Sequence, residues 1–155
     1  MASTVVDTPI GPLGLTASDS ALHGVMFDGT RVRMEGSSPV LDEAARQLGA
    51  YFDGGLVAFE LPLELHGSEF NRRCWLALAS IPYGQTVSYG EQARRLGLGH
   101  DAARAVGAAN GRNPLPIVLP CHRVIGAEGS LTGFGGGLEV KRFLLEHEGA
   151  LLRLG

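Results

Sequence analysis

The chain has 155 residues, of which 45% are hydrophobic, and this suffices for one ordinary domain or two small lobes with a packed core. Its two cysteines, Cys74 and Cys121, lack metal-ligand spacing, which argues against a disulfide framework and against a zinc ribbon. Residues 1–15 show no basic segment followed by an apolar run, and no stretch approaches the roughly 18 apolar residues of a membrane span. We therefore expect a soluble, cytoplasmic protein.

The charge is unevenly distributed along the chain. A formal net charge of -3 argues at first against a nucleic-acid binder. Residues 1–66 carry nine acidic and three basic side chains, so residues 67–155 carry a surplus of +3. All basic residues except Lys141 are arginine, which suits planar contacts to phosphates and bases, although codon bias in a high-GC genome has the same effect. The asymmetry favours nucleic-acid contact in the C-terminal part.

Strand-like segments separated by turn residues make up the start of the chain. They cover residues 3–7, 13–17 and 21–27, and a small antiparallel meander is the simplest account. Ser38 and Pro39 then fit the N-cap and the first residue of a helix that should stop at Gly54. Residues 61–67 are interpreted as the connection to a second lobe, so we expect domains at 1–66 and 67–155.

The second lobe is predicted to open with an amphipathic helix around residues 70–79. Cys74 lies beside Trp75 in this apolar pattern, so we interpret it as a small core residue and not as a nucleophile. Ser88 and Glu91 match a capping box, which starts a short helix that should end at Gly97.

A second short helix is predicted over residues 102–109, with Asp101 as its N-cap. Two short helices joined by a glycine-containing turn form a helix-turn-helix pattern, although helical hairpins without any nucleic-acid role have the same spacing. The alanines that open the second helix would allow close approach to a groove wall, and Arg104 projects from among them. The alternative is a solvated arginine on an exposed helix face.

Residues 110–124 form an apolar run that we expect to be extended and to deliver Cys121 on a rigid turn, because three prolines restrict the backbone there. A thiol with a pKa near 8.5 is only about 3% ionised at pH 7, so a nucleophile needs a base or a positive environment. His122 and Arg123 are candidates. A relay through a water or a bend in the backbone is favoured over direct contact between Cys121 and His122, because adjacent side chains rarely point the same way.

A carboxylate in the final predicted helix, residues 138–148, would orient the imidazole. We choose Glu148 for this role, although the sequence alone does not select it over Glu146. The alternative is that Cys121 is an inert buried thiol and His122 a half-buried histidine with satisfied hydrogen bonds.

Taken together, these residues resemble the O6-alkylguanine-DNA alkyltransferases, also called methylated-DNA-protein-cysteine methyltransferases. The resemblance covers residues 67–155 in order and spacing, and residues 7–13 look like those of the bacterial members. It is carried by Ile-Pro-Tyr-Gly at 81–84, Ser-Tyr-Gly at 88–90, Ala-Ala-Arg-Ala-Val-Gly at 102–107, Asn-Pro at 113–114, Pro-Cys-His-Arg-Val at 120–124 and His-Glu-Gly at 147–149.

The resemblance implies a set of catalytic residues. Cys121 would accept the alkyl group, and His122 would deprotonate it through a water while Glu148 orients the imidazole. Asn113 would brace the turn that carries the cysteine. Tyr89 would protonate or hydrogen-bond the departing guanine ring.

A second implied set contacts DNA. Arg104 would enter the base stack in place of the extruded nucleotide, and Ala102 and Ala103 would let the recognition helix sit against the minor groove. Gly107 and Arg123 are assigned to the same surface.

The remaining implications concern the pocket, the fold and the partners. Phe134, Gly135 and Gly136 would line the substrate pocket. Phe134 stands where many relatives carry tyrosine, so we expect altered substrate tolerance.

The fold would be α/β (α+β): an antiparallel sheet with a helix, then a mostly helical, winged-helix-like lobe. Neither a cofactor nor zinc is expected, since the cysteines that bind zinc in some relatives are absent. The partner would be double-stranded DNA with alkylated guanine, bound by a monomer, with cooperativity on DNA left open.

Two rival functions belong to other classes. A non-catalytic damage sensor would flip bases without transfer, but relatives of that kind lack the cysteine. A cysteine hydrolase would form an acyl-enzyme intermediate and turn over repeatedly, whereas an alkyltransferase stops after one equivalent.

Overall fold

The computed structural model describes residues 1–150 and has a mixed α/β fold. It divides into two compact units, Met1–Leu65 and His66–Gly155, and this division falls one residue before the boundary expected from the sequence. Within residues 1–150, no helix has both the length and the apolar character needed to cross a membrane.

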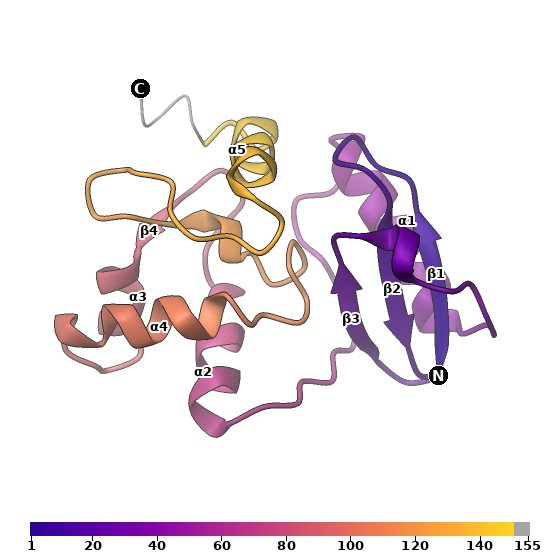
Figure 1. Cartoon of the computed structure of the whole chain (residues 1–155), viewed down its shortest axis with the longest axis horizontal. Coiled ribbons are helices and arrows are strands. Elements are labelled where there is room, and N and C mark those ends of the chain that lie inside the picture. The colour runs from indigo at the N-terminus through magenta and orange to yellow at the C-terminus, as the bar shows by residue number, and fades with distance from the viewer. Residues whose placement is uncertain (151–155) are drawn as a thin grey trace. The chain divides into compact units, whose positions relative to one another are not determined.

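The N-terminal unit is built on a three-stranded antiparallel sheet in the order β1-β2-β3 (Figure 1). Its elements are β1 (Ala2–Val6), β2 (Leu13–Ala17), β3 (Leu22–Met26), a short 3-10 helix, η1 (Gly29–Arg31), and helix α1 (Pro39–Phe52). The alternate residues Leu13, Leu15 and Ala17 of the central strand are fully buried, as expected for a sheet with one covered face. Helix α1 packs on β1 and β2, which confirms the predicted meander and its helix.

Local signals set the ends of α1. The Ser38 hydroxyl accepts a hydrogen bond from the Leu41 amide at 3.3 Å, and Pro39 occupies the first helical position, where its missing N–H costs nothing. Gly54 follows the helix with a φ of +84°, a conformation that glycine adopts without strain. Both ends lie where the sequence predicted them.

The C-terminal unit is mostly helical (Figure 1). Its elements are α2 (Glu69–Leu78), β4 (Val87–Ser88), α3 (Tyr89–Arg95), the 3-10 helix η2 (His100–Ala102), α4 (Ala103–Asn110), the 3-10 helix η3 (Cys121–Arg123), β5 (Val124–Ile125) and α5 (Leu138–His147). Strands β4 and β5 form a two-residue parallel pair that the sequence did not predict.

Helices α3 and α4 form the expected helix-turn-helix. The Ser88 hydroxyl accepts from the Glu91 amide at 3.0 Å, and Gly97 closes α3 with a φ of +79°. The prediction that Asp101 caps the second helix is wrong. Asp101 lies inside η2, where the backbone already turns, and α4 begins after Ala102 without a side-chain cap.

Buried polar contacts connect the three helices around this motif. The side-chain amides of Gln92 in α3 and Asn110 in α4 exchange hydrogen bonds of 3.1 and 2.7 Å. From α2, the indole N–H of Trp75 donates to the Ala109 carbonyl at 2.7 Å. Cys74 is fully buried in the apolar cluster between these helices, in agreement with its predicted core position. These contacts connect the two helices of the motif to each other and to α2.

Candidate active site

Asn113 braces the segment that leads to Cys121. Its side-chain Nδ2 donates to the Leu119 carbonyl at 2.8 Å, and its Oδ1 accepts from the Leu115 amide at 2.9 Å. The segment between them is buried but not extended, which corrects the sequence expectation: the Leu119 amide donates back to the Leu115 carbonyl at 2.8 Å. Ile117 has a φ of +74° inside this turn, a strained conformation for a β-branched residue.

Cys121 is the first residue of η3 and is 8% exposed. Burial raises the pKa of its thiol, and a hydrogen bond from Asn113 and the positive charge of Lys141 act in the opposite direction. The thiol is therefore protonated at neutral pH in the free protein, and its reaction as a nucleophile requires a base.

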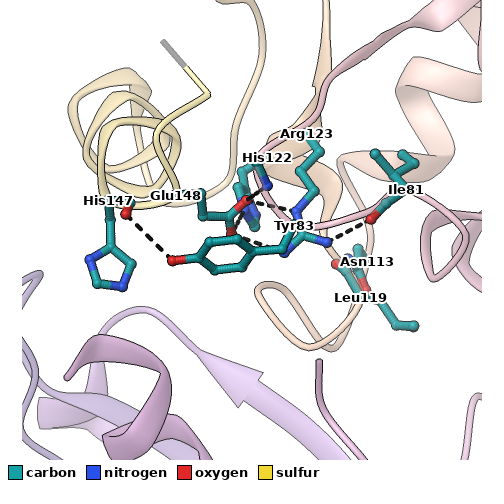
Figure 2. A network of polar contacts seen from close by, with 9 residues as sticks. Ile81, Tyr83, Asn113, Leu119, His122, Arg123, His147 and Glu148 are labelled. Atoms are coloured by element: carbon teal, nitrogen blue, oxygen red, sulfur yellow. Dashed lines mark hydrogen bonds and ion pairs between the residues drawn. The ribbon is translucent and has the colours of Figure 1, made fainter. Parts of the chain in front are cut away.

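His122, the next residue, is fully buried against Glu148. Its Nε2 lies 2.7 Å from Oε2 of that carboxylate (Figure 2). Burial lowers the pKa of His122 despite the nearby carboxylate, so the imidazole is neutral. Burial also acts to raise the pKa of Glu148, but hydrogen bonds from His122 and Arg123 outweigh it and hold that pKa well below its usual range.

The tautomer of His122 follows from these charge states. A carboxylate can only accept, so the proton of the neutral ring lies on Nε2. The other nitrogen, Nδ1, then carries a free lone pair, and this buried atom has no hydrogen-bond partner among the described residues. The structure thus places Glu148 at the position expected for the orienting carboxylate, whereas Glu146 is exposed and pairs with Arg142.

Arg123 does not face a DNA surface, and its assignment as a DNA contact is corrected. The side chain is buried, and its Nε and Nη2 donate to the two oxygens of Glu148 at 2.8 and 3.0 Å while Nη1 donates to the Ile81 carbonyl at 2.7 Å (Figure 2). Its guanidinium also lies 5.7 Å from the ring centroid of Tyr83. Arg123 therefore belongs to the support of Glu148.

A pocket of about 540 Å³ opens beside α4. Its lining contains the predicted Tyr89, Arg104 and Gly107, together with Phe134 and Gly135 of the loop after β5; the full lining is Tyr89, Ala103, Arg104, Gly107, Gly111, Thr132, Gly133, Phe134 and Gly135. Gly136, also predicted, is not among these residues. The wall is rich in glycine, which leaves room for a planar ligand beside the two aromatic rings.

Arg104 lies at this pocket on the exposed side of α4. Within residues 1–150 it makes no hydrogen bond or ion pair. Ala102 and Ala103, which precede it at the start of the helix, are half-buried, so the end of α4 presents small side chains and one long cation. This is the arrangement that the sequence predicted for the recognition helix.

Lys141 and Thr132 were missed as parts of the site. Lys141 is fully buried, and its Nζ donates to the carbonyls of Val124 and Thr132, each at 2.7 Å. The Tyr89 hydroxyl donates to the same Thr132 carbonyl at 3.3 Å. One signal was available: the single lysine of the chain falls on the apolar face of α5, three residues before the buried Leu144.

In the N-terminal unit, His23 Nε2 and Glu64 Oε2 lie 3.0 Å apart and form an ion pair when the imidazole is protonated.

Fold and site together define a helix-turn-helix protein with one buried cysteine-histidine-glutamate centre. Residues 1–65 match the ribonuclease-like domain of 6-O-methylguanine DNA methyltransferase, and residues 69–150 match its DNA-binding domain. The chain is 51% identical over 148 residues to a methylated-DNA–protein-cysteine methyltransferase of Mycolicibacterium paratuberculosis, covering 92% of this chain and 89% of the relative. A relative of the same name from Methanosarcina acetivorans is 45% identical, covering 94% and 97%.

Among solved structures, the OGT of Mycobacterium tuberculosis in complex with DNA superimposes with a TM-score of 0.88 at 47% identity, covering 97% of this chain and 94% of that one. The chain therefore belongs to the 6-O-methylguanine DNA methyltransferase family and is a DNA-repair enzyme of the methylated-DNA–protein-cysteine methyltransferase class.

Proposed function

We propose that this protein repairs O6-alkylguanine in double-stranded DNA by moving the alkyl group to Sγ of Cys121, irreversibly and once per molecule. The observation that carries the proposal is the state of His122. Its Nε2 is bound to an ionised Glu148 at 2.7 Å, and its Nδ1 carries a buried lone pair that has no hydrogen-bond partner within residues 1–150. His122 can therefore act as a base, and it directly follows Cys121 in the sequence. The other free cysteine, Cys74, has no histidine next to it.

The chemistry balances without a cofactor. The thiol proton passes to Nδ1 of His122 through a water, which suits a nitrogen that has no hydrogen-bond partner in the part of the chain that the structure describes. Sulfur then attacks the alkyl carbon, so the S–C bond forms while the C–O bond breaks, and the electron pair stays on guanine. The Tyr89 hydroxyl protonates or hydrogen-bonds the guanine ring as negative charge develops. The product thioether has no good leaving group, so the protein is spent.

The pocket fits an extruded base. The alkylated oxygen of guanine faces the interior of the duplex, so the nucleotide must be turned out at a cost of a few kcal/mol. Tyr89 and Phe134 offer aromatic faces in a pocket of about 540 Å³. Arg104 lies exposed at the edge of this pocket, without an ion pair to any described residue, and would fill the gap left in the base stack. Ala102 and Ala103 would allow α4 to approach the minor groove.

The proposed residues all lie in one unit of one chain, so a monomer suffices and cooperative binding to DNA is not required for the alkyl transfer.

We expect the protein to work in the cytoplasm, where its two thiols, Cys74 and Cys121, stay reduced. O4-alkylthymine is a second substrate to test, because it also presents an alkyl group on an exocyclic ring oxygen.

Mass spectrometry of the whole protein after reaction with an O6-methylguanine duplex tests the proposal. We expect one added methyl group per molecule, located on the peptide that contains Cys121. Cys74→Ala should still accept one methyl group, while Cys121→Ala should accept none and leave the lesion intact. Repaired DNA beside unmodified Cys121 would indicate a hydrolase-like turnover, and intact lesion beside unmodified protein would indicate a damage sensor; either outcome refutes the proposal.

A further inference from the structure

Lys141 is a buried cation that connects two parts of the site. It lies in α5 and is fully buried, although burying an ammonium is costly unless its hydrogen bonds are satisfied. One acceptor, the Val124 carbonyl at 2.7 Å, belongs to the residue directly after η3, the turn that contains Cys121. The other, the Thr132 carbonyl at 2.7 Å, belongs to the wall of the substrate pocket.

The contact at Thr132 also involves Tyr89. The Tyr89 hydroxyl donates to the Thr132 carbonyl at 3.3 Å and accepts from the Thr132 hydroxyl at 3.4 Å. The Lys141 ammonium lies 5.8 Å from the centroid of the Tyr89 ring, within the range of a cation–π contact. One cation thus holds the pocket wall, the proposed proton donor and the strand that follows the nucleophile in a fixed arrangement.

The charge of Lys141 also acts on the thiol. Burial lowers the pKa of Lys141 to about 8, and a negative charge at Cys121 works against this shift. The ammonium in turn favours ionisation of Cys121. At neutral pH, Lys141 is still charged, and among the cationic side chains of residues 1–150 it is the one that lowers the pKa of Cys121.

We propose that Lys141 is a positioning residue for alkyl transfer, which holds the pocket loop and Tyr89 against the nucleophile segment and provides a counter-charge for the Cys121 thiolate. This inference rests on the proposed function for its effect on DNA repair. Its effect on the thiol can be measured without any DNA.

The test compares Lys141→Met with Arg142→Met. Methionine has a volume close to that of lysine and removes the charge and the donors, and the control removes an equal charge from the next residue, which is exposed and pairs with Glu146. Three quantities are measured: the single-turnover rate at saturating protein, the affinity for undamaged duplex, and the rate at which iodoacetamide alkylates Cys121 at neutral pH, with Cys74 resolved by peptide mass.

We expect Lys141→Met to transfer the methyl group about 100-fold more slowly, because misplaced reacting groups cost about that much. Iodoacetamide should alkylate Cys121 about tenfold more slowly at neutral pH, because Lys141 is still charged there and a positive charge near a thiol favours the thiolate. The affinity for undamaged DNA should stay within about threefold of wild type, since Arg104 and α4 are untouched. Arg142→Met should match the wild type in all three measurements.

A folded Lys141→Met variant with the wild-type transfer rate and the wild-type iodoacetamide rate overturns the inference. If circular dichroism shows that this variant does not fold, Lys141→Gln, which keeps an N–H donor without the charge, is measured instead, and unchanged transfer and iodoacetamide rates there have the same meaning. If the wild type fails to repair O6-methylguanine, the proposed function fails, yet a slower iodoacetamide reaction in the variant still supports the action of Lys141 on the thiol.

Discussion

Arg123 and Glu148 form a two-pronged ion pair, with Nε and Nη2 of the guanidinium 2.8 and 3.0 Å from Oε1 and Oε2 of the carboxylate. The Gly84 amide adds a longer contact of 3.4 Å to Oε1. This support fixes the plane of the carboxylate, so that Oε2 faces His122. The residue directly after the proposed base therefore holds in place the group that orients that base.

Arg123→Met should lower the free energy of unfolding by about 3 to 5 kcal/mol, because it leaves a buried carboxylate without its main cationic partner. Urea denaturation followed by circular dichroism measures the change. Arg142→Met is the matched control, since it breaks an exposed pair with Glu146 and should cost less than about 1 kcal/mol. Equal losses in the two variants would contradict the role given to Arg123.

Glu148→Gln should slow alkyl transfer by about 100-fold or more, because a neutral amide no longer selects the Nε2–H tautomer that leaves Nδ1 as the base. Single-turnover kinetics on an O6-methylguanine duplex measures the rate. Glu146→Gln, on the exposed side of α5, should transfer at the wild-type rate. The assignment fails if the two variants react equally fast while both stay folded.

The protein should lose stability in acid in two stages. Burial lowers the pKa of His122 in the folded state, so below about pH 6.5 only the unfolded chain takes up that proton. The pKa of Glu148 is also lowered on folding from its ordinary value of 4.5, so further stability is lost as the pH falls below that value. Urea midpoints measured between about pH 3 and about pH 8 should decline over both ranges.

The Glu148→Gln variant separates the two stages, because glutamine does not titrate. Its lower-pH decline should be shallower than that of the wild type. A stability that is constant down to about pH 5 would show that His122 is already charged in the folded protein.

Arg104→Ala should slow repair of a lesion in duplex DNA by about tenfold, and repair in a single strand much less, because only the duplex must be unstacked at a cost of a few kcal/mol. Gel-shift titrations and single-turnover rates on both substrates give the comparison. Arg46→Ala, which removes an exposed arginine of α1, serves as the control. Equal losses on both substrates would argue that Arg104 contacts phosphate and does not enter the stack.

Elements set by local signals could be predicted from the sequence. Ser38 with Pro39, and Ser88 with Gly97, mark helix ends whose causes lie within a few residues. Asp101 shows where such prediction fails: its residue type favours the N-cap of a helix, but in the structure it lies inside the 3-10 helix η2. The segment from Asn113 to Leu119 looked extended, but side-chain bonds of Asn113 to two backbone groups fold it into a turn, and composition does not reveal such bonds.

Within the site, the sequence predicted the proposed catalytic residues better than the residues that hold them in position. Cys121 and His122 stand out as neighbours, and the family resemblance selected Glu148. The partner of Arg123 could not be foreseen, because a lone arginine beside a nucleophile is equally consistent with DNA contact and with a buried pair. Lys141 was passed over for a similar reason: its two acceptors are backbone carbonyls, and any residue type can supply them.

The fluorescence of the single tryptophan of the chain reports on helix α4. Trp75 is buried, and its indole N–H is bound to the carbonyl of Ala109 in the last turn of α4. Any tilt or fraying of that helix changes the environment of one chromophore, with no other indole to obscure the signal. Intrinsic emission can therefore follow the helix during DNA binding and after alkylation, in unlabelled protein and in real time.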